Sequence, residues 1–223
     1  MRTAAEKAEI RARFDAVDTS NVADVLDRLG HPDQGLSPGF AAMSGSRVAG
    51  WVYTLRGQMR PYGGSGDPAK MEACQGVGSG EVTVWAGDGQ GVGYFGELIA
   101  LGMQERGCVG AVVEGGVRDL RWLRQHDFPV FARYRTPVQS IGRWSVTGWQ
   151  EPVSISGATT RRVRVDPGDF ILGDEDGVIV VPEALVDQVL NAAEELTATE
   201  VAVRAALRDG LSLSECLTRF GHV

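Results

Sequence analysis

The chain has 223 residues, of which 43% are hydrophobic and 23% are charged, a composition typical of soluble globular proteins. Its net charge of −7 argues against nucleic acid as a partner, because phosphate binding needs a basic surface. No apolar run is long enough to span a membrane, and the first residues are charged, so we expect a cytoplasmic protein. Three scattered cysteines and three histidines argue against a histidine zinc site or a Ser-His-Asp triad.

Two helices are expected near the start of the chain. Residues 3–16 form an amphipathic pattern rich in Ala, Glu and Arg. Residues 19–21 (Thr-Ser-Asn) would cap a second helix that ends at Gly30. A loop over 31–46 then leads to a strand (47–56), a glycine-rich turn region (58–67) and a short helix (68–76).

The central stretch predicts a β-α-β unit. Strands over 81–85 and 109–113 flank a helix over 96–106, and the expected crossover is right-handed. The second strand then delivers Arg118 and Asp119 beside the amino end of that helix. In open α/β sheets this carboxyl edge of the strands is where ligands bind.

Three kinds of chemistry would meet at that edge. The first amides of the helix, at Leu98 and Ile99, lack internal partners and favour an anion. Arg118 offers a planar fork for a carboxylate. Asp119 offers a hard oxygen ligand for Mg²⁺ or Mn²⁺. A small 2-oxo acid chelating a metal would fit this trio.

Two other readings compete with this one. The Arg-Asp pair could be a plain helix start, in which Asp119 caps residues 120–126 and Arg118 is solvated, and the motif alone favours this reading. Residues 91–96 also match the dinucleotide pattern G-x-G-x-x-G, with Glu114 at a plausible distance. Five residues separate Trp85 from Gly91, so the turn is not tight, which argues against a dinucleotide site.

The second half of the chain is expected to be rich in strands, followed by a long helix. We predict strands over 129–134, 153–155, 161–165, 170–172 and 178–181, and a hairpin rather than a calcium loop over the acidic turn 174–177. A helix over 182–208 would carry an apolar stripe, with Glu194, Glu195 and Glu200 lying off it as a solvated face. The stripe consists of Leu185, Val189, Ala192, Leu196, Val203 and Leu207.

These elements predict one α/β domain over residues 1–223. Helices occupy residues 1–30, an α/β core occupies 47–182, and helices follow over 183–223. The central β-α-β unit and the strand-rich stretch would pack as layers around one core.

Several short motifs, in their order and spacing, resemble one known family. They are Asn21 to Asp27, Gly96-Glu97-Leu98, residues 107–110, Gly116-Val117-Arg118-Asp119, Pro167-Gly168-Asp169, residues 174–178 and Val181-Pro182. Together they resemble the family of the regulator of ribonuclease activity A (RraA), which includes class II 4-hydroxy-4-methyl-2-oxoglutarate aldolases. The resemblance covers about residues 19–210 and implies a layered β/β/α domain of the swivelling type, assembled as a homotrimer or hexamer.

The resemblance also implies roles for individual residues. Arg118 would bind the pyruvyl group together with the backbone at Gly96, Leu98 and Ile99, and Asp119 would bind the divalent metal, Mg²⁺ or Mn²⁺. Glu97 stands where the aldolases usually have Asp, and it would hold a water on the metal. Glu195 of a neighbouring subunit would approach the metal through water, with Glu194 and Glu200 as rivals.

The implied activity is a metal-dependent retro-aldol cleavage of a 4-hydroxy-2-oxo acid to pyruvate, with oxaloacetate decarboxylation as a side activity. The main alternative is a non-catalytic regulator that binds a ribonuclease or a helicase. A third reading is a methyltransferase acting on demethylmenaquinone, for which the sequence offers no cofactor loop beyond the weak pattern at 91–96.

Overall fold

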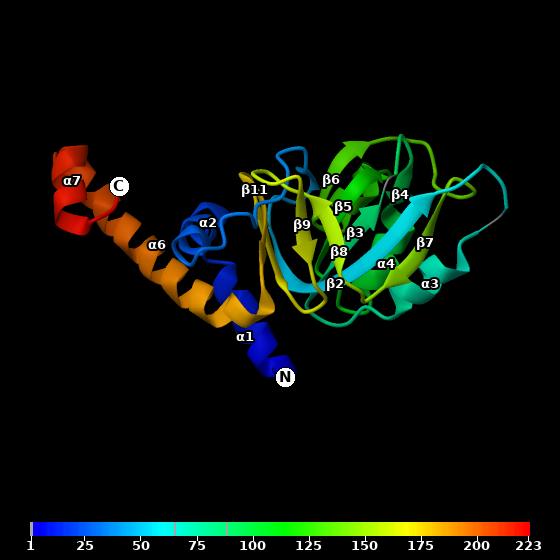
Figure 1. Ribbon diagram of the computed structural model, residues 1–223, viewed down its shortest axis with the longest axis horizontal. Coiled ribbons are helices and arrows are strands. Elements are labelled where there is room, and N and C mark those ends of the chain that lie inside the picture. The colour runs from blue at the N-terminus through cyan, green and yellow to red at the C-terminus, as the bar shows by residue number, and fades with distance from the viewer. Residues whose placement is uncertain (1, 65, 88) are drawn as a thin grey trace.

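The computed structural model describes residues 2–64, 66–87 and 89–223, and it shows a mixed α/β fold with helices at both ends (Figure 1). Within these residues the main sheet has nine strands, and the path through seven of them is β1-β6-β5-β3-β2-β10-β11, with β4 on β5 and β7 on β2. The strands are β1 (Ala41–Ser44), β2 (Val48–Met59), β3 (Glu81–Gly87), β4 (Gly93–Phe95), β5 (Gly110–Val117), β6 (Val130–Arg135), β7 (Trp144–Trp149), β10 (Phe170–Asp174) and β11 (Gly177–Val181).

The predicted β-α-β unit is present. Strands β3 and β5 are parallel neighbours, and α4 (Glu97–Gln104) lies between them in the chain. The short strand β4 was not predicted; it pairs in parallel with β5. Strand β5 also runs past Gly115 and Gly116, where the sequence suggests its end. A Cβ at Gly115 would lie 2.3 Å from the Tyr94 ring, so glycine here makes room for a neighbour instead of ending the strand.

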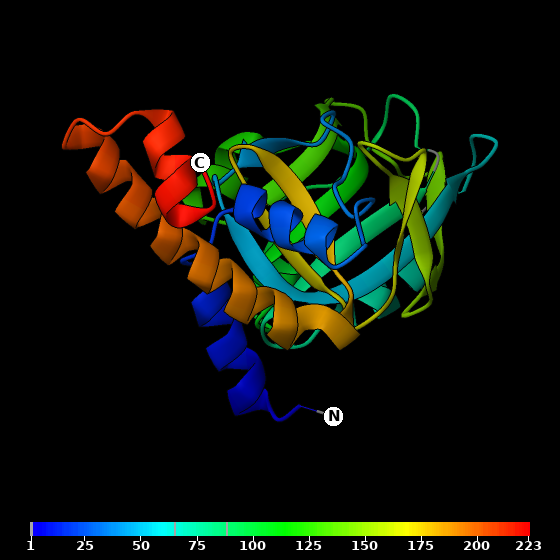
Figure 2. The same ribbon diagram turned by 60° about the vertical axis from the view of Figure 1, so that its left-hand side comes forward.

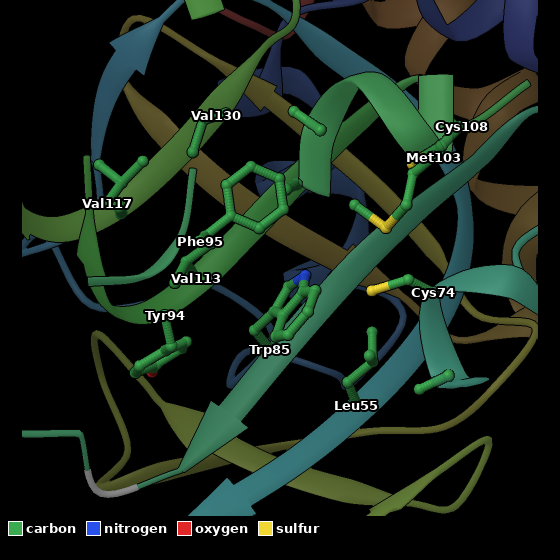
Figure 3. Close-up of a cluster of buried hydrophobic side chains, with 14 of the residues drawn as sticks. Leu55, Cys74, Trp85, Tyr94, Phe95, Met103, Cys108, Val113, Val117 and Val130 are labelled. Atoms are coloured by element: carbon green, nitrogen blue, oxygen red, sulfur yellow. The ribbon is translucent and has the colours of Figure 1, made fainter. Parts of the chain in front are cut away.

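The elements form three layers, as the resemblance implies. Helices α3 (Pro68–Gln75), α4 and α5 (Leu120–Gln125) cover one face of the main sheet, with the buried cluster of Figure 3 between helices and sheet. The pair β8 (Val153–Ser156) and β9 (Arg162–Val165) covers the other face through a second cluster, rich in valine and isoleucine. Both faces of β3 and β5 are therefore buried, which explains their nearly continuous apolar sequences.

The terminal helices pack against the far end of the sheet. Helices α1 (Ala4–Phe14), α2 (Thr19–Arg28) and α6 (Val186–Arg208) share a third cluster with β2, β10 and β11, in which Phe14 stacks on Phe170 at 4.4 Å. Beyond this cluster α6 extends away from the body and carries α7 (Leu213–Phe220), as Figure 2 shows.

Two predictions about helices need correction. The apolar stripe of α6 is confirmed at Val189, Leu196 and Val203, which are buried. The other predicted positions, Leu185, Ala192 and Leu207, are only partly buried. Residues Glu183–Leu185 form a 3₁₀ turn, so the regular helix begins at Val186 instead of residue 182. The newly buried positions are Val186, Leu190, Ala193 and Ala206.

The start of α2 also differs from the prediction. Thr19 begins the helix instead of preceding it, and its amide and hydroxyl both donate to the Asp174 carboxylate, at 2.8 and 2.7 Å. Asp174 opens the turn between β10 and β11, whose antiparallel pairing confirms the predicted hairpin. No helix in the described residues combines the length and apolarity needed to cross a membrane.

Candidate active site

A cavity of about 380 Å³ lies at the carboxyl edge of the sheet, where β5 ends and α4 begins. Its wall combines the start of α3, strand β4, the first turn of α4 and the two residues after β5. The structure thus brings together most of the residues that the sequence singles out at this edge. Those that line the cavity are Gly96, Leu98, Ile99, Arg118 and Asp119.

Asp119 is turned toward α4 and not toward the helix that follows it. It occupies the N-cap position of α5, yet its side chain makes no capping hydrogen bond. Instead its Oδ2 lies 3.4 Å from the amide of Glu97. Its backbone is left-handed, with φ 61° and ψ 31°, a conformation that Asp tolerates better than most residues. Such a conformation away from glycine is frequent at functional sites, and the carboxylate is not used to cap α5.

Arg118 lies beside Asp119 and faces the same helix start. Its Nε is 3.3 Å from Asp119 Oδ2, and the two side chains are 39% and 36% exposed. Its backbone amide donates to the Phe95 carbonyl at 3.1 Å, which ties the end of β5 to the residue before Gly96. Because the pair is only half buried, solvent and a small ligand can reach both side chains.

The first turn of α4 presents backbone amides next to this pair. Gly96 is the N-cap residue and has no side chain to satisfy the first amides. A Cβ at Gly96 would lie 2.6 Å from Asp119 Oδ2, so glycine is what lets the carboxylate approach the helix. Leu98 is 77% exposed at the mouth of the cavity, although it is a large apolar residue.

Glu97 does not line the cavity. Its carboxylate lies on the side of His126, with Oε1 3.9 Å from Nε2 of that histidine. Its amide contacts Asp119, so the residue touches the site through its backbone. The role in holding a metal-bound water stays a prediction.

The three acidic residues of α6 lie in the helix that runs away from the body of the same protomer (Figure 1). Glu194 pairs with Arg13 at 2.6 Å, and Glu200 pairs with Arg204 on the same helix. Glu195 is exposed. A contact of Glu195 with the cavity would therefore need a second copy of the chain.

The donor set at the cavity suits a magnesium-type ion. Within the described residues no three His, Cys, Asp or Glu side chains cluster closely enough to hold a metal. Mg²⁺ is usually held by one or two carboxylates and keeps several waters or substrate oxygens. A half-exposed Asp119 beside open space meets that requirement, whereas a closed four-ligand zinc site would not form here.

Sequence reasoning missed a buried lysine in the same cavity. Lys70 is only 7% exposed, and its Nζ donates to the Tyr94 carbonyl. Burial lowers the pKa of Lys70 to about 8. Helical spacing in the sequence could have shown that Lys70 is buried. Asp67 caps α3, and Lys70 lies three residues before Ala73 and four before Cys74, so all three share the buried face of the helix.

The glycine pattern at 91–96 is not a dinucleotide loop. Strand β4 occupies Gly93–Phe95, so the glycines do not form a tight turn between a strand and its helix. The amide of Gly93 donates to the Val138 carbonyl at 2.7 Å and is not free to bind a phosphate.

Curated relatives share most of this chain. A protein from Halalkalibacterium halodurans named "Putative 4-hydroxy-4-methyl-2-oxoglutarate aldolase" is 28% identical over 201 residues, covering 89% of each chain. Protein DlpA of Legionella pneumophila is 27% identical over 199 residues, which cover 89% of this chain but 31% of DlpA. The chain thus spans about a third of DlpA and nearly all of the Halalkalibacterium protein.

The fold also matches a solved structure, that of Streptomyces coelicolor RraAS2. It is described as an unusual member of the RNase ES inhibitor RraA protein family. The TM-score is 0.75 at 24% identity, over 88% of this chain and 96% of the other, and this likeness shows the fold alone. The family model described as RraA-like, Aldolase/RraA, matches residues 19–180. The chain therefore belongs to the RraA-like family.

Proposed function

We propose that this chain is a divalent-metal-dependent carbon–carbon lyase acting on 2-oxo acids. Its main reaction would be the retro-aldol cleavage of a 4-hydroxy-2-oxo acid, such as 4-hydroxy-4-methyl-2-oxoglutarate, which releases pyruvate. Decarboxylation of oxaloacetate would be a side activity. The observation that carries the proposal is the placement of Asp119, whose carboxylate leaves the α5 cap and faces the α4 start beside Arg118.

Each residue of the cavity would have its own role in the reaction. Arg118 would pair with the substrate carboxylate, and the first amides of α4 would bind the oxygens of the pyruvyl group. Asp119 would hold Mg²⁺ or Mn²⁺, which acts as a Lewis acid at the keto oxygen. A water molecule would take the 4-hydroxyl proton as the C3–C4 bond breaks, which gives a second carbonyl product and the enolate of pyruvate. Arg118 with the helix amides would stabilise the negative charge of the enolate until a proton from water converts it to pyruvate.

Names of relatives support this assignment. The Halalkalibacterium protein that shares 89% of the chain has an aldolase name. Oligomerisation is part of the proposal, because Glu195 can reach a cavity only on another copy. We propose a homotrimer or hexamer in which Glu195 of one subunit lies beside the metal site of the next and contacts the metal through water.

The test is turnover by the purified protein. With Mg²⁺ or Mn²⁺ present, pyruvate release from 4-hydroxy-4-methyl-2-oxoglutarate and oxaloacetate is followed through lactate dehydrogenase, and enzyme-free metal solutions give the background. We expect release above background that EDTA abolishes and added metal restores. Absence of turnover with either substrate and either metal would contradict the proposal and favour the ribonuclease or helicase regulator.

A further inference from the structure

Lys70 is a buried cation with an incomplete set of partners. Its ammonium has three donor hydrogens, and one of them is used by the Tyr94 carbonyl. The faces of Trp85 and Trp144 lie 5.4 and 5.8 Å from Nζ. Among the described residues no carboxylate forms an ion pair with it. Asp67 is near in the chain, but its two oxygens accept the amides of Lys70 and Val146.

A buried charge without a counter-ion is costly, and such charges are usually paired or bind a ligand. Lys70 lines the cavity that also holds Arg118, and the charge of Arg118 adds to the effect of burial on the amine. Arg118 itself already has Asp119 as a partner at 3.3 Å. Asp67 also lines the cavity, and its charge acts on Lys70 without forming an ion pair with it. Among the described residues of the lining, Lys70 is therefore the cation without a carboxylate in direct contact.

We infer that Lys70 is a specificity-determining residue that binds a second anionic group of the substrate, at the end opposite the pyruvyl carboxylate. The inference rests on the proposed function, because it takes Arg118 and the α4 start as the site of the first carboxylate. With Lys70 in this role, the site binds 2-oxo diacids more tightly than 2-oxo monoacids of the same length.

The placement of these groups agrees with that class of ligand. Lys70 is tied to the carbonyl of Tyr94, and Gly96 at the helix start lies two residues further along extended chain. Lys70, Arg118 and the first turn of α4 line the same cavity, so one ligand with an anionic group at each end can face both sides of it.

The test uses two matched ligands that the proposed reaction cannot cleave. 2-Oxoglutarate and 2-oxopentanoate share a five-carbon 2-oxo acid chain and differ only in the terminal carboxylate. Their dissociation constants are measured by calorimetry with the full chain and Mg²⁺. We expect 2-oxoglutarate to bind about 10- to 100-fold more tightly, as for a hydrogen bond between charged groups.

Lys70→Met should bring the affinity for 2-oxoglutarate down to that for 2-oxopentanoate and leave the latter unchanged. Arg135→Gln is the control, because Arg135 is exposed and lines the neighbouring hollow that Arg118 and Asp119 also border. This variant should keep the preference for the diacid. A thermal melt of each variant shows whether it folds.

The wild-type chain gives a second readout that needs no variant. Because the pKa of Lys70 is about 8, the preference for 2-oxoglutarate should weaken as the pH rises above that value. The charged or titratable groups acting on Lys70 are Asp67, Cys74 and Arg118. 2-Oxopentanoate controls for changes at Arg118, since both ligands would use it for the first carboxylate.

Equal affinity of the two ligands in the wild-type chain overturns the inference, as does a preference that survives in Lys70→Met or is lost in Arg135→Gln. A preference that does not change with pH also counts against Lys70. Failure of the proposed function has a different signature, because then neither ligand binds in a metal-dependent way.

Discussion

Gly96→Ala is predicted to disable the site while leaving the fold intact. Gly96 has φ −166° and ψ −176°, an extended backbone that any residue can adopt, so alanine brings no backbone strain. The obstacle is the space around the new methyl group. Its carbon would lie 2.6 Å from Asp119 Oδ2 and 3.1 Å from Cγ of Arg118.

The magnitude follows from these distances. An ordinary contact for a Cβ begins at 3.4 Å, so the Asp119 carboxylate must retreat by close to 1 Å. A displacement of that size in a catalytic group can cost about 100-fold in rate. The cost in stability should stay near 1 kcal/mol, the low end for overpacking, because both side chains are half exposed and can move.

Gly102→Ala is the matched control in the same helix. A Cβ at Gly102 would meet nothing within 4 Å, and the residue is exposed. This variant should gain about 0.5–1 kcal/mol of stability, because alanine loses less backbone entropy in a helix, and should keep full activity. Both variants are assayed for pyruvate release and by denaturant unfolding. Full activity in Gly96→Ala would refute the close approach of Asp119 to the helix start as a requirement for catalysis.

Two further predictions concern the rest of the chain. Burial raises the pKa of Cys74 to about 12 and that of Cys108 to about 11, so a maleimide at neutral pH should label these thiols only after unfolding. Mass spectrometry of native and unfolded samples measures the labelling. Rapid labelling of the native protein would contradict the prediction. The hydrogen bond from Arg13 lowers the pKa of Glu194 below 4.5, so its contribution to stability is full above that value and is lost as the pH falls through the folded-state pKa. Glu194→Gln should therefore lower stability at neutral pH by less than about 1 kcal/mol, since the pair is exposed, and by less still in acid. Denaturant melts at both pH values measure the difference, and a larger loss in acid than at neutral pH would contradict the assignment.

The sequence predicted the elements whose signals are local. The apolar run of β5, the helix after it and the acidic hairpin between β10 and β11 each carry their own periodicity or turn residues. Strands β1 and β7 were missed because they pair with distant strands, β6 and β2. For such strands the partner, more than the intrinsic preference of the residues, decides the conformation.

Part of the candidate site could also be predicted from the sequence. The length of the crossover places Arg118 and Asp119 beside the start of α4, and this follows from strand and helix dimensions alone. The left-handed backbone of Asp119, which turns its carboxylate away from α5, has no signature in the sequence. The environment of Lys70 depends on Trp85, Tyr94 and Trp144, which three different strands supply.

The division of roles between Asp119 and Arg118 is the central claim, and one comparison tests it most directly. Mn²⁺ affinity by calorimetry and pyruvate release from oxaloacetate are measured for the wild-type chain, Asp119→Asn and Arg118→Lys, with enzyme-free metal subtracted. We predict that Asp119→Asn loses both metal affinity and turnover. Arg118→Lys should keep the metal but raise KM by about 10- to 100-fold, because lysine cannot form the bidentate pair. Wild-type Mn²⁺ affinity in Asp119→Asn would contradict the account.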